Sequence, residues 1–329
     1  MVNSTEGVIF LAQESKPKES LPNRTMRYTQ RSGTAARQWQ SDLRDKLSAL
    51  LKIDDLVAQR RAIFLDPREA SVSEKGKYLL HDLTIQSTPG RRIPVALAIP
   101  KSGDGPFPAV VCIHGHGGSR FSPFDPQAQE NAHIYKAFGA ALAERGFVCI
   151  STEVGQHEVY EAGRTLMGER LWDVTRCVDY LESLDAPKIH RSRIGCAGLS
   201  LGGEMAMWLG AMDTRVAAVG SAGFLTNMDH MEKNHCMCWK LDGLRNLADW
   251  ADIYSLIAPR PLQCQNGLNE PPPDFIVPLA QVAMAEIQTI YRDFHAADNA
   301  VLDIHPGAHE IDLPGLLAFL EAHLHASKH

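Results

Sequence analysis

The chain has 329 residues, of which 44% are hydrophobic and 22% charged, and its 33 Lys and Arg against 39 Asp and Glu give a formal net charge of −6. A basic surplus, which phosphate binding normally requires, is missing, so we expect no nucleic-acid partner. These fractions also exclude a fully disordered chain. No apolar run approaches the roughly 20 residues of a membrane span, and the first residues lack the pattern of a signal peptide, so we expect no membrane association.

The seven cysteines form an odd number, which argues against a disulfide framework and for a reduced, cytoplasmic enzyme. Four fall in apolar, strand-like runs and one in a helical pattern, where a free cysteine behaves as a small hydrophobic residue. The remaining two are close together in a polar segment. In chain order they are Cys112, Cys149, Cys177, Cys196, Cys236, Cys238 and Cys264.

Residues 1–75 are predicted to form an N-terminal arm with a helical extension. The first 35 residues are polar, which is typical of an extended or partly ordered arm. From Gln38 to Gln59 the apolar residues fall near helical spacing and predict one or two amphipathic helices, which Pro67 closes. The mixed helical pattern suggests that this extension contributes contacts in a homodimer.

Residues 76–329 are predicted to form one catalytic α/β domain. Tyr78–Ile85 and Ile93–Ile99 alternate in polarity and predict an antiparallel pair at the edge of a sheet. Further strands are expected at Ala109–Ile113, Phe147–Ser151, Ile194–Gly198, Val216–Val219, Pro261–Gln265 and Ala300–Ile304. Helices are expected at Ala132–Arg145, Met167–Leu181, Gly202–Met212, Val277–Tyr291 and Leu313–Leu324. This alternation predicts a mainly parallel central sheet with helices on both faces and chemistry at the carboxyl ends of the strands.

Ser200 is the candidate nucleophile. It is the centre of Gly198-Leu-Ser-Leu-Gly202, a G-x-S-x-G sequence between a predicted buried strand and a predicted helix. In that context the small flanking residues permit a sharp turn that lifts the serine hydroxyl clear of the sheet. The alternative interpretation is a glycine-rich turn with a serine that caps the helix.

A glycine-rich loop, His114-Gly-His-Gly-Gly118, directly follows the predicted strand Ala109–Ile113. Glycines at this place let backbone N–H groups approach a developing oxyanion, so we expect donors from His116 and Gly117, with a further donor from Leu201. The alternative is a metal site at the two histidines. With no cysteine or carboxylate partner nearby in the sequence they make a poor site, so we predict no metal.

The general base is expected late in the chain, because hydrolases of this type order the triad as Ser, then Asp or Glu, then His. His309 follows the strand Ala300–Ile304, whereas its rival His305 stands at the strand end before a proline. The acid should follow Pro261–Gln265, where Glu270 and Asp274 both qualify. Glu270 is closer to the strand end and is favoured, and Asp274 stays open as the alternative acid.

These motifs resemble the α/β-hydrolase superfamily, and more narrowly the bacterial acetyl xylan esterases and dienelactone hydrolase-like esterases. The resemblance spans about Lys77 to Leu324 and includes Ala258-Pro-Arg-Pro-Leu262 and Gly307-Ala-His-Glu310 besides the two glycine motifs. In these families an Asp before a proline is the usual triad acid. Here Glu270 occupies that position before three prolines, a departure that keeps Asp274 open.

Residues 224–256 are expected to border the pocket as an insertion. Phe224, Met228 and Trp239 are candidate substrate-binding walls, with core packing as an equal alternative. The segment Asn234-His-Cys-Met-Cys-Trp239 looks like a metal or redox cluster, but two cysteines and one histidine fall short of four ligands, so packing is favoured. Glu153 ends a strand on the catalytic edge and either binds a polar substrate group or holds loops together.

The sequence as a whole predicts a serine esterase that needs no cofactor. His309 takes the Ser200 proton, the hydroxyl attacks a carboxylic ester, and water releases the acid from an acyl-enzyme. Acetyl or carbohydrate esters are candidate small-molecule substrates. Two alternatives remain: a peptidase or amidase that uses the same triad, and a non-catalytic binding protein on a hydrolase scaffold.

Overall fold

The computed structural model describes residues 24–325, except for the side chains of residues 233 and 234. Its strands are β1 Arg68–Lys75, β2 Tyr78–Thr88, β3 Arg91–Pro100, β4 Phe107–Ile113, β5 Val148–Thr152, β6 Ile189–Leu199, β7 Val216–Ala222, β8 Leu262–Gly267 and β9 Ala300–His305. Its α-helices are α1 Gly33–Leu51, α2 Asp54–Gln59, α3 Phe138–Ala143, α4 Leu166–Ser183, α5 Leu201–Met212, α6 Met228–Asn234, α7 Leu244–Leu247, α8 Trp250–Ser255, α9 Val277–Asp293 and α10 Leu313–Leu324. Three short 3₁₀ turns are η1 Ala132–Tyr135, η2 Met237–Trp239 and η3 Ala297–Asn299.

The strands form one sheet in the order β1-β2-β3-β5-β4-β6-β7-β8-β9. From β5 through β9 all neighbours are parallel, whereas β1, β2, β3 and β5 pair antiparallel. Strands β4 and β8 are almost wholly buried and lack alternation, because helices cover both faces of the sheet. The predicted fold class, α/β with a mainly parallel sheet, is confirmed.

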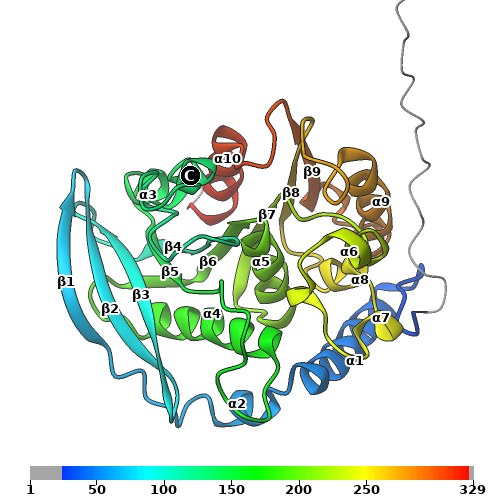
Figure 1. Ribbon diagram of the computed structural model, residues 1–329, viewed down its shortest axis with the longest axis horizontal. Coiled ribbons are helices and arrows are strands. Elements are labelled where there is room, and N and C mark those ends of the chain that lie inside the picture. Colours follow the sequence, from blue (N-terminus) through cyan, green and yellow to red (C-terminus); the bar gives the residue numbers. More distant parts are fainter. Residues whose placement is uncertain (1–23, 326–329) are drawn as a thin grey trace, which may run out of the picture.

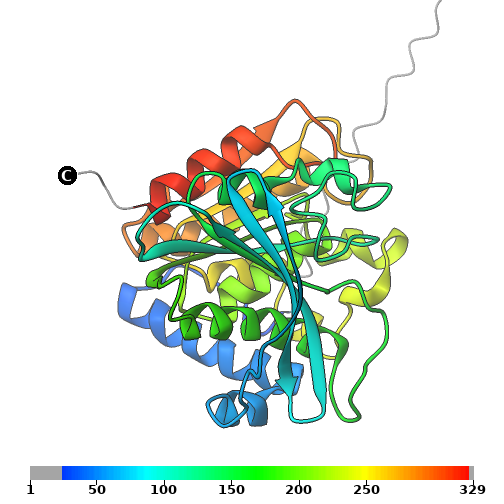
Figure 2. The ribbon, with the colours of Figure 1, turned by 90° about the vertical axis from the view of Figure 1, so that its left-hand side faces the viewer.

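Helices lie on both faces of the sheet (Figures 1 and 2). Helices α3 and α10 pack on one face in a core that contains Phe138, Leu316 and Leu320. Helices α4, α5 and α9 cover the other face, and α1 joins the same core. A layer of helices therefore packs on each face of the sheet, and the carboxyl ends of the parallel strands lie at the edge between these two layers.

The N-terminal extension packs against this domain through α1. Ser32 caps the helix by accepting the N–H of Ala35, and Lys52 ends it in the left-handed region. Leu43 and Leu47 on its buried face are 0% exposed and belong to the same hydrophobic core as the residues of α5. The expected arm at residues 1–23 falls outside the described part of the chain.

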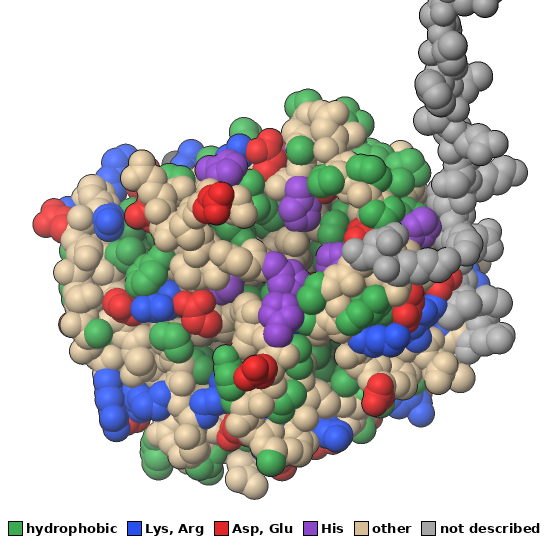
Figure 3. Space-filling view, viewed as in Figure 1, with side chains coloured by type: hydrophobic (Ala, Val, Ile, Leu, Met, Phe, Trp, Pro, Cys, Tyr) green, Lys and Arg blue, Asp and Glu red, His purple; other side chains and the backbone are tan. Residues whose placement is uncertain are grey.

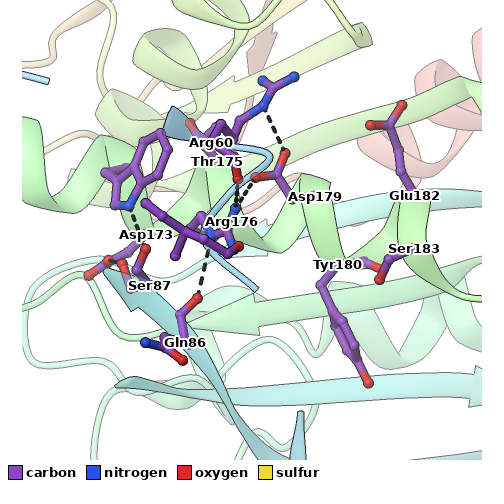
Figure 4. Close-up of polar contacts among 12 residues, drawn as sticks. Arg60, Gln86, Ser87, Asp173, Thr175, Arg176, Asp179, Tyr180, Glu182 and Ser183 are labelled. Carbon is purple, nitrogen blue, oxygen red and sulfur yellow. Dashed lines mark hydrogen bonds and ion pairs between the residues drawn. The ribbon is translucent and has the colours of Figure 1, made fainter. Parts of the chain in front are cut away.

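Buried polar contacts tie the segment after α1 to α4 (Figure 4). The Arg176 guanidinium donates to the Ile63 carbonyl at 2.7 Å and to Asp179 Oδ2 at 2.6 Å, and Arg60 Nε lies 3.6 Å from Asp179 Oδ1. Side chains from one helix therefore satisfy backbone groups of the connection that leads into β1. That connection is held in place although it has little regular structure of its own.

Two segments differ from the sequence prediction. The single helix expected at Ala132–Arg145 is broken, because Lys136 and Ala137 take positive φ angles of 52° and 48° between η1 and α3. Strand β1 was not predicted, since all of its residues are exposed and no hydrophobic alternation marks it. Among the described residues, no helix has the length and apolar character needed to cross a membrane.

Candidate active site

Ser200 occupies a sharp turn between β6 and α5. Its φ of 61° and ψ of −123° lie outside the regions that residues with a side chain normally adopt. Its N–H donates to the Ala222 carbonyl of the neighbouring strand at 2.9 Å, which holds the turn in place. A serine held in this strained conformation at the carboxyl edge of the sheet is what the G-x-S-x-G pattern predicts.

The glycines around Ser200 are required by close backbone approaches. A Cβ on Gly198 would lie 2.6 Å from the Ile113 carbonyl oxygen, and one on Gly202 would lie 2.8 Å from the His114 carbonyl oxygen. On Gly203, a Cβ would lie 2.5 Å from the Ala222 carbonyl oxygen. Strands β4, β6 and β7 therefore meet α5 too closely for any side chain at these three positions.

His309 and Glu270 form a pair beside this turn. His309 Nδ1 lies 2.8 Å from Glu270 Oε2, and the Glu270 side chain is only 1% exposed, whereas that of His309 is 25% exposed. Asp274, the alternative acid, instead places Oδ2 3.1 Å from Nδ1 of His235. Each carboxylate thus has its own histidine, and the one that contacts His309 is Glu270.

The His309 ring lies in the corner that contains Ser200. A Cβ on Gly223, the residue after β7, would lie 2.9 Å from His309 Cε1, and the preceding Ala222 accepts the Ser200 N–H. The Phe275 ring stacks on His309 with centroids 5.7 Å apart. The rival His305 is buried at the end of β9, where its Nδ1 accepts the N–H of Gly307.

The loop after β4 lies directly against the nucleophile. A Cβ on Gly115 would be 3.1 Å from Ser200 Cβ, and the Gly115 N–H is already donated to Tyr135 Oη at 2.7 Å. The N–H groups of His116 and Gly117 follow that of Gly115 along this loop. Leu201 is the first residue of α5, so its N–H has no acceptor within the helix.

Contacts of the Glu153 carboxylate with Arg120 and His114 hold this loop in place. The fully buried His114 places Nε2 3.2 Å from Glu153 Oε2, and Arg120 donates to Glu153 Oε1 at 3.0 Å. Burial raises the pKa of Glu153, but the hydrogen bonds from His114 and Arg120 outweigh burial and lower it to about 2. These contacts favour the loop-holding interpretation of Glu153 over substrate binding.

Comparison with known proteins gives this geometry a context. A family model described as "Glucuronyl esterase, fungi" matches residues 86–220. A Bacillus subtilis (strain 168) protein named as a hydrolase, YtaP, is 24% identical over 251 residues, which are 69% of this chain and 81% of the relative.

Two solved structures show the same arrangement of elements. One, from Bacteroides fragilis NCTC 9343, is named as an acetyl xylan esterase. It has a TM-score of 0.70 at 17% identity and covers 86% of this chain and 78% of its own. The other is a glucuronoyl esterase from Caldicellulosiruptor kristjansonii. It has a TM-score of 0.63 at 16% identity, and the match covers 89% of this chain and 87% of that structure. The chain has the α/β-hydrolase fold. The proteins that it resembles are named as hydrolases and esterases.

The expected pocket walls of the hydrolase are core residues. Phe224, Met228 and Trp239 are each 1% exposed. The Phe224 and Trp239 rings pack against Trp250, with centroids 5.1 Å and 5.6 Å away. Burial therefore favours the packing alternative for these three side chains, because a substrate wall must present surface to the pocket.

A cleft of about 790 Å³ is lined by Gly117 and Gly118 of the loop after β4. Its other walls include Arg91, Tyr160 and Glu161. Arg91 is paired with Glu161 at 3.3 Å within this lining. The cleft is therefore rich in hydrogen-bonding groups. It adjoins the loop His114–Gly118, the expected oxyanion loop.

The hydrolase also contains a cluster that the sequence prediction missed. His116, His157, Cys236 and Cys238 place their ligand atoms within 4.8 Å of one another. The sequence prediction counted one histidine beside the two cysteines, whereas the structure brings His116 and His157 close to them. The deciding contacts join segments 122 and 79 residues apart, which local spacing does not reveal. His235, the histidine in the motif, is paired with Asp274 instead.

Two buried ionisable groups near this cluster were also missed. Arg170 is fully buried and lies with Nη1 3.5 Å from Cys238 Sγ. Burial raises the pKa of Glu204, in the first turn of α5, to about 8, although the charge of Arg170 opposes this shift. The only sequence signal for either residue is a charge on the apolar face of a helix.

Proposed function

We propose that this hydrolase is a serine esterase in which Ser200, His309 and Glu270 form the catalytic triad. The observation that carries the proposal is the 2.8 Å contact of Glu270 with His309, next to a serine in a strained turn. A buried carboxylate at this position orients the imidazole and stabilises its charged form. Because Nδ1 contacts Glu270, Nε2 of His309 is the nitrogen that takes the serine proton.

The mechanism follows from these positions. His309 removes the Ser200 proton as Oγ attacks the ester carbonyl, and the negative charge moves to the carbonyl oxygen. Backbone N–H groups of Leu201 and of His116 or Gly117 would hold that oxygen. Protonated His309 gives its proton to the leaving alcohol, and the acyl group stays on Ser200. Water, deprotonated by His309, then releases the carboxylic acid.

The proposed substrates are small esters with a carbohydrate or similarly hydroxylated part. Proteins with this fold are named as acetyl xylan and glucuronoyl esterases, which supports this class. The polar cleft that begins at Gly117 supports it too, because paired charges and a tyrosine suit hydroxyl groups better than a long acyl chain. Acetyl and uronate esters of sugars are therefore the first compounds to assay.

A fluorophosphonate probe tests the nucleophile. We expect the wild-type enzyme to be labelled and Ser200→Ala to remain unlabelled, with p-nitrophenyl acetate hydrolysis lost in the same variant. Failure of the wild type to label would favour a binding protein on a hydrolase scaffold. Faster cleavage of matched p-nitroanilides than of p-nitrophenyl esters would favour the peptidase or amidase alternative.

We also propose that the enzyme acts in the reducing cytoplasm. All seven cysteines are unpaired, and Cys236 is exposed, which suits a reducing compartment. The proposed homodimer is a separate expectation that light scattering after size-exclusion chromatography measures. A monomeric mass would contradict it.

A further inference from the structure

Four side chains with metal-binding atoms converge beside the oxyanion loop. His116 Nε2 lies 3.1 Å from Cys238 Sγ, and His157 Nε2 lies 3.3 Å from Cys236 Sγ. All four ligand atoms lie within 4.8 Å of one another. Around a tetrahedral Zn²⁺, sulfur and nitrogen ligands stand about 3.3–3.8 Å apart, so small side-chain rotations bring this set onto a metal. Figure 3 shows histidine side chains gathered in the middle of this face.

The chemistry of the donors favours zinc. Two thiolates and two imidazoles are a ligand set typical of tetrahedral zinc, and they neutralise the charge of the ion. Magnesium and calcium prefer oxygen ligands, and none of the four groups is a carboxylate. Each thiol contacts a different histidine, so each of the two loops that carry a histidine contributes a ligand beside a cysteine.

The fully buried Arg170 contacts the cluster. Its guanidinium lies 3.5 Å from Cys238 Sγ and also donates to the carbonyl of Gln156, the residue before His157. The same side chain thus fixes one cysteine and the backbone of the loop that carries one histidine.

The cluster joins three segments that are far apart in the sequence. His116 belongs to the loop after β4, His157 to the loop between β5 and α4, and the cysteines to the segment around η2. His157 and Cys236 are exposed, so an ion can enter from solvent. With four protein ligands the coordination is complete, which is typical of a structural rather than a catalytic zinc.

We propose that His116, His157, Cys236 and Cys238 bind one Zn²⁺, which fastens the oxyanion loop to the segment that contains η2. Metal binding itself is independent of the proposed esterase function, whereas its effect on the loop rests on that function. The position of His116 next to Gly117, an expected oxyanion donor, gives the ion influence over the active site without contact with the reacting atoms.

Metal content tests the proposal directly. We expect protein expressed with added zinc to retain about one Zn²⁺ per chain after gel filtration, as measured by mass spectrometry of the metal. Replacement by Co²⁺ should give the visible absorption of tetrahedral cobalt together with a thiolate-to-cobalt band. The same content is expected in Ser200→Ala, which separates this result from any failure of the esterase proposal.

Variants in the exposed segment complete the test. Zinc affinity, measured by competition with a chromophoric chelator, should fall at least about tenfold in Cys236→Ser and recover in part in Cys236→His. Met237→Ala, at an exposed position between the two cysteines, is the matched control and should bind as the wild type does. A wild type that retains no zinc, a Cys236→Ser variant with unchanged affinity, or a Cys236–Cys238 disulfide in protein handled without oxidant would overturn the proposal.

Discussion

At the scale of single residues, the proposed acid of the triad follows from which histidine each carboxylate contacts. Glu270 contacts His309, and Asp274 contacts His235. Both carboxylates are buried and lie near the end of β8, so burial and position do not separate them. Their hydrogen-bond partners separate them, because only a carboxylate that is hydrogen-bonded to the proposed base fixes the tautomer of its imidazole.

We therefore predict different losses for two isosteric substitutions. Glu270→Gln should lower kcat for p-nitrophenyl acetate by roughly a thousandfold or more, since the amide favours the wrong imidazole tautomer. Asp274→Asn should lower it less than about tenfold. Steady-state kinetics of both purified variants measures this, and a larger loss in Asp274→Asn would reverse the assignment.

Glu153 gives a prediction about pH. Although burial raises its pKa, hydrogen bonds from His114 and Arg120 lower it from 4.5 to about 2, so the folded state favours the charged carboxylate. Its contribution to stability is therefore complete above about pH 4.5 and disappears as the pH falls towards 2. The side chain is 35% exposed, so after solvent screening we expect about 1–2 kcal/mol.

Urea denaturation at several pH values checks this. Glu153→Gln should lower the free energy of unfolding at pH 7 by about 1–2 kcal/mol, and its difference from the wild type should shrink below pH 4.5. Glu158→Gln, at an exposed position in the same loop, is the control and should change the free energy by less than about 0.5 kcal/mol. An equal loss at pH 7 and pH 3 would show that packing, not charge, is responsible.

At the scale of elements, the proposed zinc links loops that the sheet alone does not connect. A ligand that binds only the folded state stabilises it by about 2.7 kcal/mol when present at a hundred times its dissociation constant. For a domain of this size we predict that chelation lowers the Tm by roughly 3–5 °C. Differential scanning calorimetry with and without a chelator measures the change.

The control for this prediction is the chelator's effect on a variant with a weakened site. The chelator should lower the Tm of Cys236→Ser by less than it lowers the Tm of the wild type. A chelator that lowers the Tm of both proteins equally would point to a metal bound elsewhere. Zinc that restores the Tm of the chelated wild type would support the assignment.

The elements that the sequence predicted well are those whose pattern is set locally. Helix α10 has the predicted bounds Leu313–Leu324, and β4 contains the predicted Ala109–Ile113. Strand β1 was not predicted, because a wholly exposed edge strand has no apolar face. The helix expected at Ala132–Arg145 is broken at Lys136 and Ala137, whose positive φ angles have no signal in the local sequence.

The same distinction applies to the site. The turn around Ser200 was predictable because its glycines are adjacent in sequence and each is needed for a close approach. The choice between Glu270 and Asp274 needed the position of His235, which the sequence does not give. The four-ligand cluster could not be predicted, since His116 and Cys238 are 122 residues apart and meet only after folding.

At the scale of the whole molecule, the N-terminal extension shares the core of the catalytic domain. On α1, Gln40 donates to the carbonyls of Ser255 and Ala258 at 3.0 Å and 2.8 Å, and Arg44 donates to that of Ala211 at 2.8 Å. These bonds satisfy backbone groups at the ends of α5 and α8. Residues 33–51 therefore form part of the support beneath the nucleophile helix.

A shared core predicts one cooperative unfolding transition. Leu43→Ala and Leu47→Ala each remove a side chain that is 0% exposed, so each should lower the free energy of unfolding by about 2–5 kcal/mol. Val57→Ala, at a position 51% exposed on α2, is the control and should cost less than about 0.5 kcal/mol. Urea curves recorded by tryptophan fluorescence and by esterase activity should coincide for all three variants, because loss of α1 removes the support of α5. An earlier fluorescence transition that leaves activity intact would show that the extension unfolds on its own.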